Sequence, residues 1–255
     1  MLRAIALFIA LALPAVSAAQ EEVVLGLSQN KVSITTNFDG SEILIVGAVK
    51  RETAIPTDEP LGVIVAIQGP SEPLTVRRKE KRFGIWVNIE SVEVDAAPSF
   101  YAVATSGPLN ELLSATEDLR YKISIPKAIR SVGAPMTVKD SQSFTEAVIR
   151  IRKANDLFQL LENAVELNQE TLFKTSIAMP ANLTEGNYST RIFLTRSGKV
   201  VSEYETVIDV RKVGLERWLY TLSRQQPLMY GLLSLAIAIL SGWGAAAIFS
   251  GLRRN

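Results

Sequence analysis

Apolar and polar residues alternate along most of the chain between residues 23 and 105, in short runs that turn residues separate. A period of two is typical of a β-strand with one buried face. Separators such as Gly69-Pro70 favour tight turns. The pattern predicts strands over 23–27, 32–36, 42–49, 62–68, 74–78, 84–89 and 100–105. We expect Trp86, on the sixth of these, to lie in the core.

After residue 140 the pattern takes a helical period and later returns to strands. Ser143 and Glu146 form a capping box, and apolar residues follow at intervals of three and four, which predicts a helix over about 143–162. A shorter helix is expected over 108–118. Strands then resume over 172–179, 188–195 and 200–211.

Short strands at this density are typical of an antiparallel β-sandwich of the immunoglobulin type. We therefore expect a mainly β ectodomain with one inserted helix. Its strands fall into a first β-sandwich unit over 20–119 and a second β-rich unit over 120–213. The sequence leaves open whether these are two domains or one continuous sandwich.

Both ends of the chain carry an apolar stretch. Arg3, an uncharged run over 4–16 and small residues up to Ala19 follow the pattern of a secretory signal peptide over 1–19, cleaved after Ala18 or Ala19. Residues 227–252 carry no charge and are long enough to cross about 30 Å of hydrocarbon, which predicts one transmembrane helix. Together these segments place the ectodomain outside the cytoplasm and a tail over 253–255 inside it.

Two features of the C-terminal region favour contacts in or at the membrane. Within 214–226, Leu215, Trp218, Leu219 and Leu222 share one helix face, which predicts an amphipathic juxtamembrane helix. Small residues lie one turn apart in the transmembrane segment, where they let two helices approach closely. They are Ser241, Gly242, Ala245, Ala246, Ala247 and Gly251. We expect self-association or a membrane-protein partner along this helix.

Composition narrows the classes of function. The net charge of +1 provides no overall attraction for nucleic acid. The sequence has no cysteine and no histidine, which excludes disulfides, thiolate nucleophiles and catalysis by imidazole. We expect no enzyme activity, no metal and no cofactor. The absence of cysteine is more typical of a bacterial envelope protein than of a eukaryotic cell-surface protein, which often carries disulfides. We therefore expect the protein to lie in the inner membrane, with its ectodomain in the periplasm.

The densest charged segment is 77–82, between two predicted strands. Its cations are Arg77, Arg78, Lys79, Lys81 and Arg82. One interpretation is a site for an anion or an acidic partner, and the other is a solvated turn that keeps a hairpin soluble. Strand alternation sends Arg77 and Lys79 to the face opposite Arg78. Asn88 and Tyr101, polar groups on nearby strands, either line the same site or serve the sheet edge and the core.

Several motifs carry a family resemblance. They are Gly69-Pro70, Val76-Arg77-Arg78-Lys79, Gly84-Ile85-Trp86-Val87-Asn88, Pro98-Ser99-Phe100-Tyr101, Leu172-Phe173, Met179-Pro180, Gly186-x-Tyr188, Tyr230-Gly231 and Gly242-Trp243. With them the chain resembles the Alph_Pro_TM family of transmembrane proteins from alphaproteobacteria. The resemblance implies an inner-membrane protein with a periplasmic ectodomain. It brings no assigned activity and no site residues, and links the family loosely to sulfite-exporter-like membrane proteins.

Two hypotheses of function follow. In the first, the ectodomain is a binding or accessory module for another inner-membrane protein such as a transporter. In the second, it is a periplasmic module that binds a small anion, a sulfur oxyanion or phosphate, through the basic segment 77–82. An enzyme ranks last because the sequence offers no nucleophile with a base.

Overall fold

The computed structural model describes residues 21–34, 39–51, 59–131, 140–212 and 215–252. The expected signal peptide over 1–19 and the tail over 253–255 lie outside the described residues. In 215–217 and 247–252 the helices are described without their side chains.

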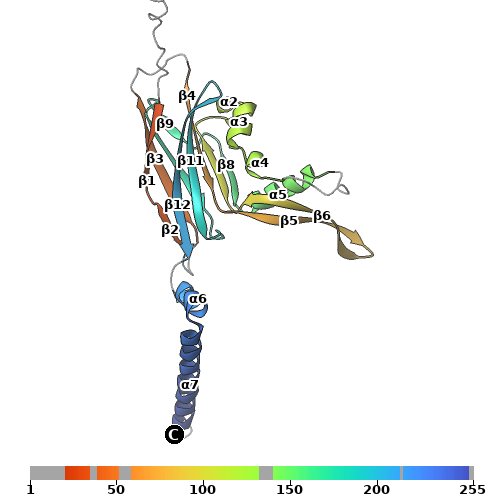
Figure 1. Ribbon diagram of the computed structural model, residues 1–255, viewed down its shortest axis with the longest axis vertical. Coiled ribbons are helices and arrows are strands. Elements are labelled where there is room, and N and C mark those ends of the chain that lie inside the picture. Colours follow the sequence, from red (N-terminus) through yellow and green to blue (C-terminus); the bar gives the residue numbers. More distant parts are fainter. Residues whose placement is uncertain (1–20, 35–38, 52–58, 132–139, 213–214, 253–255) are drawn as a thin grey trace, which may run out of the picture.

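Two sheets pack face to face and form the body of the ectodomain (Figure 1). The first sheet has the order β1 (Glu21–Leu27), β3 (Ser41–Arg51), β10 (Leu172–Met179) and β9 (Glu166–Asn168). The second has the order β2 (Lys31–Ile34), β12 (Lys199–Lys212), β11 (Gly186–Arg196), β4 (Leu61–Gln68), β7 (Tyr101–Thr105) and β8 (Phe158–Leu161). The chain is therefore mainly β, as expected.

Alternate residues of the two sheets fill the core between them. Ile43 and Ile177 come from the first sheet, and Val65 and Ile192 come from the second. Strand β10 is buried at every second residue along its whole length, and its bounds are those that the sequence predicts. The period of two therefore identified the inner faces of these strands correctly.

The expected boundary near residue 120 does not divide the ectodomain. Each of the two larger sheets mixes strands from before and after that position, so the described strands build one continuous sandwich. The pairing is also not purely antiparallel: β12 runs parallel to β2, and β8 runs parallel to β7.

A third layer covers the outer face of the second sheet. Ile64, Val103 and Phe193 point into a second apolar cluster beneath short helices. These are α2 (Leu109–Leu112), α3 (Ala115–Tyr121), α4 (Ile125–Ala128) and α5 (Gln142–Ala154). Strand β4 is buried on both faces because it lies between the two clusters.

The helices differ from expectation in extent. Helix α5 ends at Ala154 rather than near 162, because Asp156 takes a left-handed conformation with φ of 58° and Phe158–Leu161 pairs with β7 instead. The helix expected over 108–118 is split in two at Leu113-Ser114. The hydroxyl of Ser114 there accepts a hydrogen bond from the N–H of Glu117 and caps α3.

Strands β5 (Ser71–Arg82) and β6 (Ile85–Pro98) form a two-stranded sheet of their own, longer than the sequence predicts. The base of this hairpin packs on the body, and its outer half projects sideways (Figure 1). The expectation that Trp86 lies in the core is wrong, because this part of β6 lies beyond the body and leaves the side chain 68% exposed.

Two helices follow β12. Helix α6 (Leu215–Gln225) corresponds to the expected amphipathic segment, and α7 (Pro227–Leu252) has the bounds that the sequence predicts for the membrane span. Within the described residues, Pro227–Ala246 is the one stretch of helix long and apolar enough to cross a membrane, and none of it is buried. It extends away from the sandwich (Figure 1).

Candidate functional site

The outer half of the β5–β6 hairpin displays the basic segment. Residues that face each other in an antiparallel pair lie on the same side of the sheet. Lys79 is opposite Asn88 and Lys81 is opposite Trp86, so these residues and Arg77 share one face. We call Arg77, Lys79 and Lys81 the cation row.

Arg78 lies on the opposite face and holds the hairpin to the body. Its guanidinium donates to Glu90 at 2.8 Å and to the hydroxyl of Ser143 at 2.6 Å, and lies 4.7 Å from the centroid of the Phe144 ring. Asp140 approaches it at 3.9 Å. Both partners Ser143 and Phe144 lie in α5, so Arg78 serves as a structural clamp rather than a free binding group.

The other four cations of the segment differ in whether a carboxylate pairs with them. Arg82 pairs with Glu80 at 3.1 Å. Across the described parts of the chain, no ion pair or hydrogen bond engages the side chains of the cation row. Since residues 77–90 hold five cations and two carboxylates, this outer half of the hairpin carries a local charge of 5 − 2 = +3.

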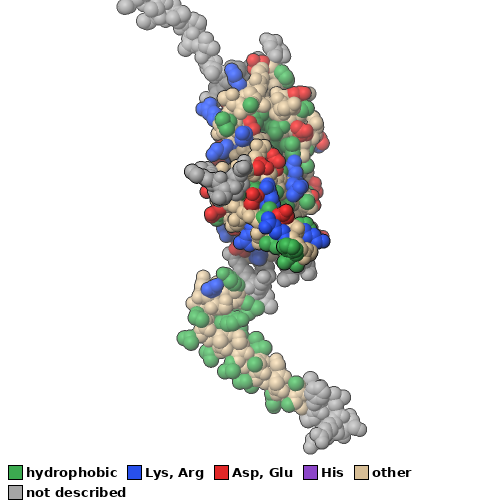
Figure 2. Space-filling view, turned by 90° about the vertical axis from the view of Figure 1, so that its right-hand side faces the viewer, with side chains coloured by type: hydrophobic (Ala, Val, Ile, Leu, Met, Phe, Trp, Pro, Cys, Tyr) green, Lys and Arg blue, Asp and Glu red, His purple; other side chains and the backbone are tan. Residues whose placement is uncertain are grey.

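Apolar side chains surround the end of the hairpin. Phe83 and Gly84 form its two-residue turn with φ of 50° and 86°, the left-handed pair that tight hairpins require. The Phe83 side chain is fully exposed, and Ile85 and Trp86 beside it are largely exposed. Figure 2 views the side from which the hairpin projects and shows Lys and Arg side chains around apolar ones at the end of the ectodomain nearest the C-terminal helices.

Tyr101 and Asn88 lie apart from each other. Tyr101 is fully buried, and its hydroxyl donates to the carbonyls of Ile123 at 2.8 Å and Lys122 at 3.2 Å. Burial raises the pKa of Tyr101 to about 12. Its assignment to a binding site is therefore wrong, because the side chain completes the core. Asn88 is exposed on the hairpin, on the face of the cation row.

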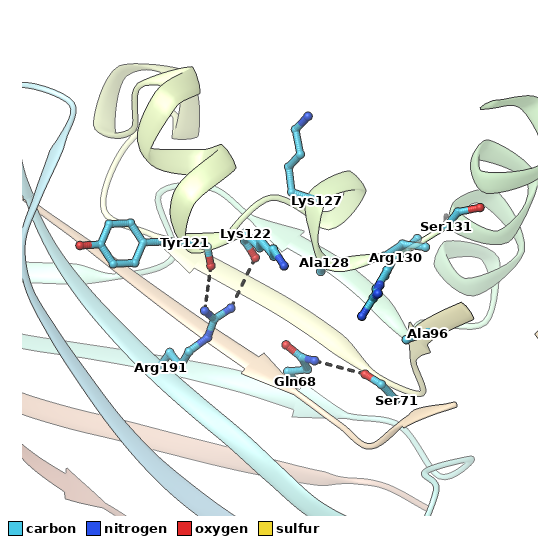
Figure 3. Close-up of a pocket in the computed structure, with 11 residues that line it drawn as sticks. Gln68, Ser71, Ala96, Tyr121, Lys122, Lys127, Ala128, Arg130, Ser131 and Arg191 are labelled. Carbon is cyan, nitrogen blue, oxygen red and sulfur yellow. Dashed lines mark hydrogen bonds between the residues drawn. The ribbon is translucent and has the colours of Figure 1, made fainter. Parts of the chain in front are cut away.

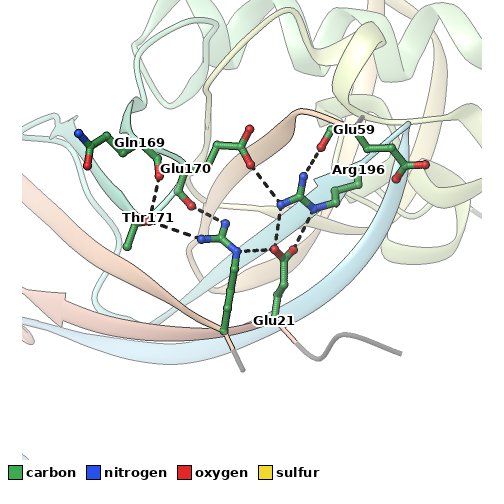
Figure 4. A network of polar contacts seen from close by, with 7 residues as sticks. Glu21, Glu59, Gln169, Glu170, Thr171 and Arg196 are labelled. Carbon is green, nitrogen blue, oxygen red and sulfur yellow. Dashed lines mark hydrogen bonds and ion pairs between the residues drawn. The ribbon is translucent and has the colours of Figure 1, made fainter. Parts of the chain in front are cut away.

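A buried ionic network joins the ends of three strands (Figure 4). Glu21 accepts hydrogen bonds from Arg51 at 2.6 Å and from Arg196 at 2.8 and 3.2 Å, and Arg196 also reaches Glu170 and the carbonyl of Glu59. Burial by itself raises the pKa of Glu21, but the two guanidinium groups outweigh it and lower the pKa. The carboxylate and guanidinium groups of the network are already paired with one another. We therefore assign the network a structural role and do not consider it a ligand-binding site. No local sequence pattern indicates this network, because its members lie far apart in the chain.

The small residues of α7 face outward. Ser241, Gly242, Ala245 and Ala246 are exposed, and a Cβ atom added to Gly242 would meet open space. Ala247 and Gly251 belong to the part of α7 described without side chains. Nothing within the described chain thus uses this surface, which stays available for another helix.

The part of the chain that the structure describes holds no cluster of three or more His, Cys, Asp or Glu side chains able to bind a metal ion. The hairpin itself presents unpaired cations and exposed apolar side chains.

Comparison with known proteins assigns most of the chain to a family. The sequence profile of the family described as "Putative transmembrane protein (Alph_Pro_TM)" matches residues 22–251. No curated protein matches the chain. A solved structure with some similarity is "Crystal structure of BslA - A bacterial hydrophobin", at 12% identity over 78% of this chain and 97% of that chain. Its TM-score of 0.21 carries no argument about fold or function.

Proposed function

Because the chain belongs to the Alph_Pro_TM family of transmembrane proteins, we propose that it is a single-pass inner-membrane protein whose periplasmic ectodomain binds another membrane protein. The signal-peptide pattern at the N-terminus and the apolar helix α7 support this topology. The two sheets packed around one core support an immunoglobulin-like sandwich as the scaffold of the ectodomain.

The observation that carries the binding role is the cation row beside Trp86 on a hairpin that leaves the body. An exposed tryptophan next to an arginine resembles the residues that dominate protein interfaces, and the two lysines add positive charge around it. The complementary partner surface is acidic and has an apolar pocket for Trp86 or Phe83. Electrostatic attraction of this kind guides association and selects among partners.

A small anion is a weaker candidate for this hairpin. Arg78 and Arg82 are already paired with carboxylates. Alternate residues of a strand are about 6.6 Å apart, so the cation row suits an extended acidic surface better than a single phosphate or sulfur oxyanion.

The test is photo-crosslinking in native membranes, with the full chain at its native level and a crosslinking residue at position 83. We expect one dominant membrane-protein product. The triple variant Arg77→Gln, Lys79→Gln, Lys81→Gln should lose most of that product, and added salt should weaken it. The matched control Lys127→Gln, Arg150→Gln, Lys153→Gln removes three exposed cations elsewhere and should leave the yield unchanged.

Two outcomes contradict the proposal. One is the absence of any product from the hairpin, and the other is an equal yield from the triple variant and the wild type. If the crosslinked product contains only two copies of this chain, the proposed partner is wrong and the hairpin mediates self-association.

A further inference from the structure

A second cationic site lies on the body, between the base of the hairpin and the α3–α4 segment (Figure 3). It is an open cleft of about 430 Å³. Ser71 and Ala96 contribute from the hairpin, Gln68 from β4 and Arg191 from β11. The segment around α4 provides Lys122 and Arg130, while Lys127 borders the cleft with its side chain directed away from it.

Arg191 is held in place within the cleft. Its guanidinium donates to the carbonyls of Tyr121 at 2.8 Å and Lys122 at 3.4 Å, and lies 5.2 Å from the centroid of the Phe193 ring. These contacts use two of the five N–H donors of an arginine. The Tyr101 hydroxyl also interacts with this guanidinium, and the donors that are left are available to a ligand in the cleft.

Two further cations are fixed by their backbone. Lys122 ends α3 in a left-handed conformation with φ of 54°. Arg130 exchanges two backbone hydrogen bonds with Ala96, at 2.9 and 3.1 Å, which fixes it against the hairpin base. Figure 3 shows the side chains of Lys122, Arg130 and Arg191 extending into the same space, whereas Lys127 points away.

The cleft supplies no negative charge of its own. The described residues that line it include no aspartate and no glutamate, and no described carboxylate pairs with Lys122 or Arg130. Gln68 and Ser71, hydrogen-bonded to each other at 3.2 Å, add neutral polar groups beside the cations. Like charges brought together in this way repel one another, and a bound anion removes that repulsion.

We propose that this cleft binds a phosphate-class oxyanion. Guanidinium groups match the paired oxygens of such an anion, and lysine adds a point charge. A volume of about 430 Å³ exceeds that of a single phosphate and leaves room for an attached organic group. Free phosphate and the phosphate headgroup of a lipid share this chemistry. The site is separate from the cation row, so the inference does not rest on the proposed function.

Isothermal titration of the full chain in a non-ionic detergent tests this site. One arm uses inorganic phosphate and the other dihexanoyl-phosphatidic acid, each against sodium chloride of equal ionic strength. Arg130→Gln and Lys122→Asn each remove a charge, and asparagine tolerates the left-handed backbone at position 122. We expect each variant to weaken binding by roughly tenfold or more. The control Lys127→Gln should change the affinity by less than about twofold.

Thermal unfolding of each variant separates a lost site from a lost fold. Binding in only one arm identifies the source of the phosphate and supports the site. The proposal is overturned if neither ligand binds at millimolar concentration. It is also overturned if Arg130→Gln and Lys122→Asn, folded as the wild type, bind as tightly as Lys127→Gln.

Discussion

The guanidinium of Arg78 lies over the ring of Phe144, at 4.7 Å from its centroid, and joins the hairpin to helix α5. At the same level the register of the hairpin shifts between Arg78 and Lys79, where β6 has one residue more than β5. On the body side of this point Val92 and Val94 are buried, and on the far side every residue of the hairpin is exposed. Arg78 thus marks the boundary between the packed base and the projecting half.

Replacing Arg78 by alanine should loosen the hairpin and leave the sandwich intact. The variant loses the ion pair with Glu90, the hydrogen bond to Ser143 and the contact with Phe144. We expect faster amide hydrogen exchange in β5 and β6 and unchanged exchange in β10 and β11. Arg77→Ala is the control, and equal protection of the hairpin in both variants would contradict the role of the clamp.

The buried carboxylate of Glu21 should make the protein sensitive to acid. Its pKa in the folded chain is lowered from the ordinary value of 4.5. Its contribution to the free energy of unfolding is therefore complete above pH 4.5 and is lost as the pH falls below that value. Urea unfolding of the full chain in detergent should show this loss as the pH is lowered below 4.5.

Glu21→Gln should remove that acid dependence. At pH 6 it should lower the free energy of unfolding by roughly 3 kcal/mol, because Arg51 and Arg196 lose a buried charged partner. The control Glu22→Gln breaks an exposed ion pair with Lys50 at 3.6 Å, worth at most about 1 kcal/mol. Identical pH profiles for Glu21→Gln and the wild type would rule out this assignment.

Tyr101 should control stability at alkaline pH. The pKa of its buried hydroxyl is raised to about 12 from 10.0, so its contribution is complete below pH 10 and is lost as the pH rises toward 12. Tyr101→Phe should lack this alkaline component. It should also cost about 1–2 kcal/mol at neutral pH, because the carbonyl of Ile123 loses its donor and that of Lys122 keeps only the longer bond from Arg191. Urea unfolding at pH 7 and pH 11 measures both effects, and a wild-type alkaline loss that persists in Tyr101→Phe would argue against them.

Gly242→Leu should disturb contacts between molecules and leave the chain itself folded. A Cβ atom at this position meets open space within the chain. A bulky side chain there would keep a second helix from approaching closely. We expect crosslinked or co-purified partner to fall several-fold while expression and thermal unfolding stay the same. Ile239→Val, an exposed change in the same helix, is the control, and an unchanged yield from Gly242→Leu would exclude this helix face as a contact.

The sequence predicted best those elements whose pattern is local. The bounds of α7 and β10 agree with the structure because an unbroken apolar run and a strict period of two need no distant partner. Helix α5 was predicted too long, since Phe158 and Leu161 continue its apolar spacing but belong to a strand that pairs with β7. Non-local pairing overrode the local pattern there.

The hairpin shows a second reason why a sequence pattern can mispredict burial. The alternation at Ile85, Val87 and Ile89 indicates which side chains share a face, but not whether a second layer covers that face. These residues lie beyond the body and are exposed. The opposite faces of Arg77 and Arg78 were predicted correctly because alternation alone decides them. The cleft around Arg191 and Arg130 was missed because its cations come from separate strands and loops.

The path of β12 decides how the protein would bear a mechanical load. This strand pairs with β11 along 11 residue pairs and with the parallel β2 on its other side, and it leads toward α6 and the span (Figure 1). A pull on the anchor along this strand would act across its hydrogen bonds with the antiparallel β11, which lie perpendicular to the strand. The backbone hydrogen bonds between the strands would then be loaded together in shear, and they would not break one at a time. A protein tethered between a membrane and a bound partner would therefore hold its fold under tension.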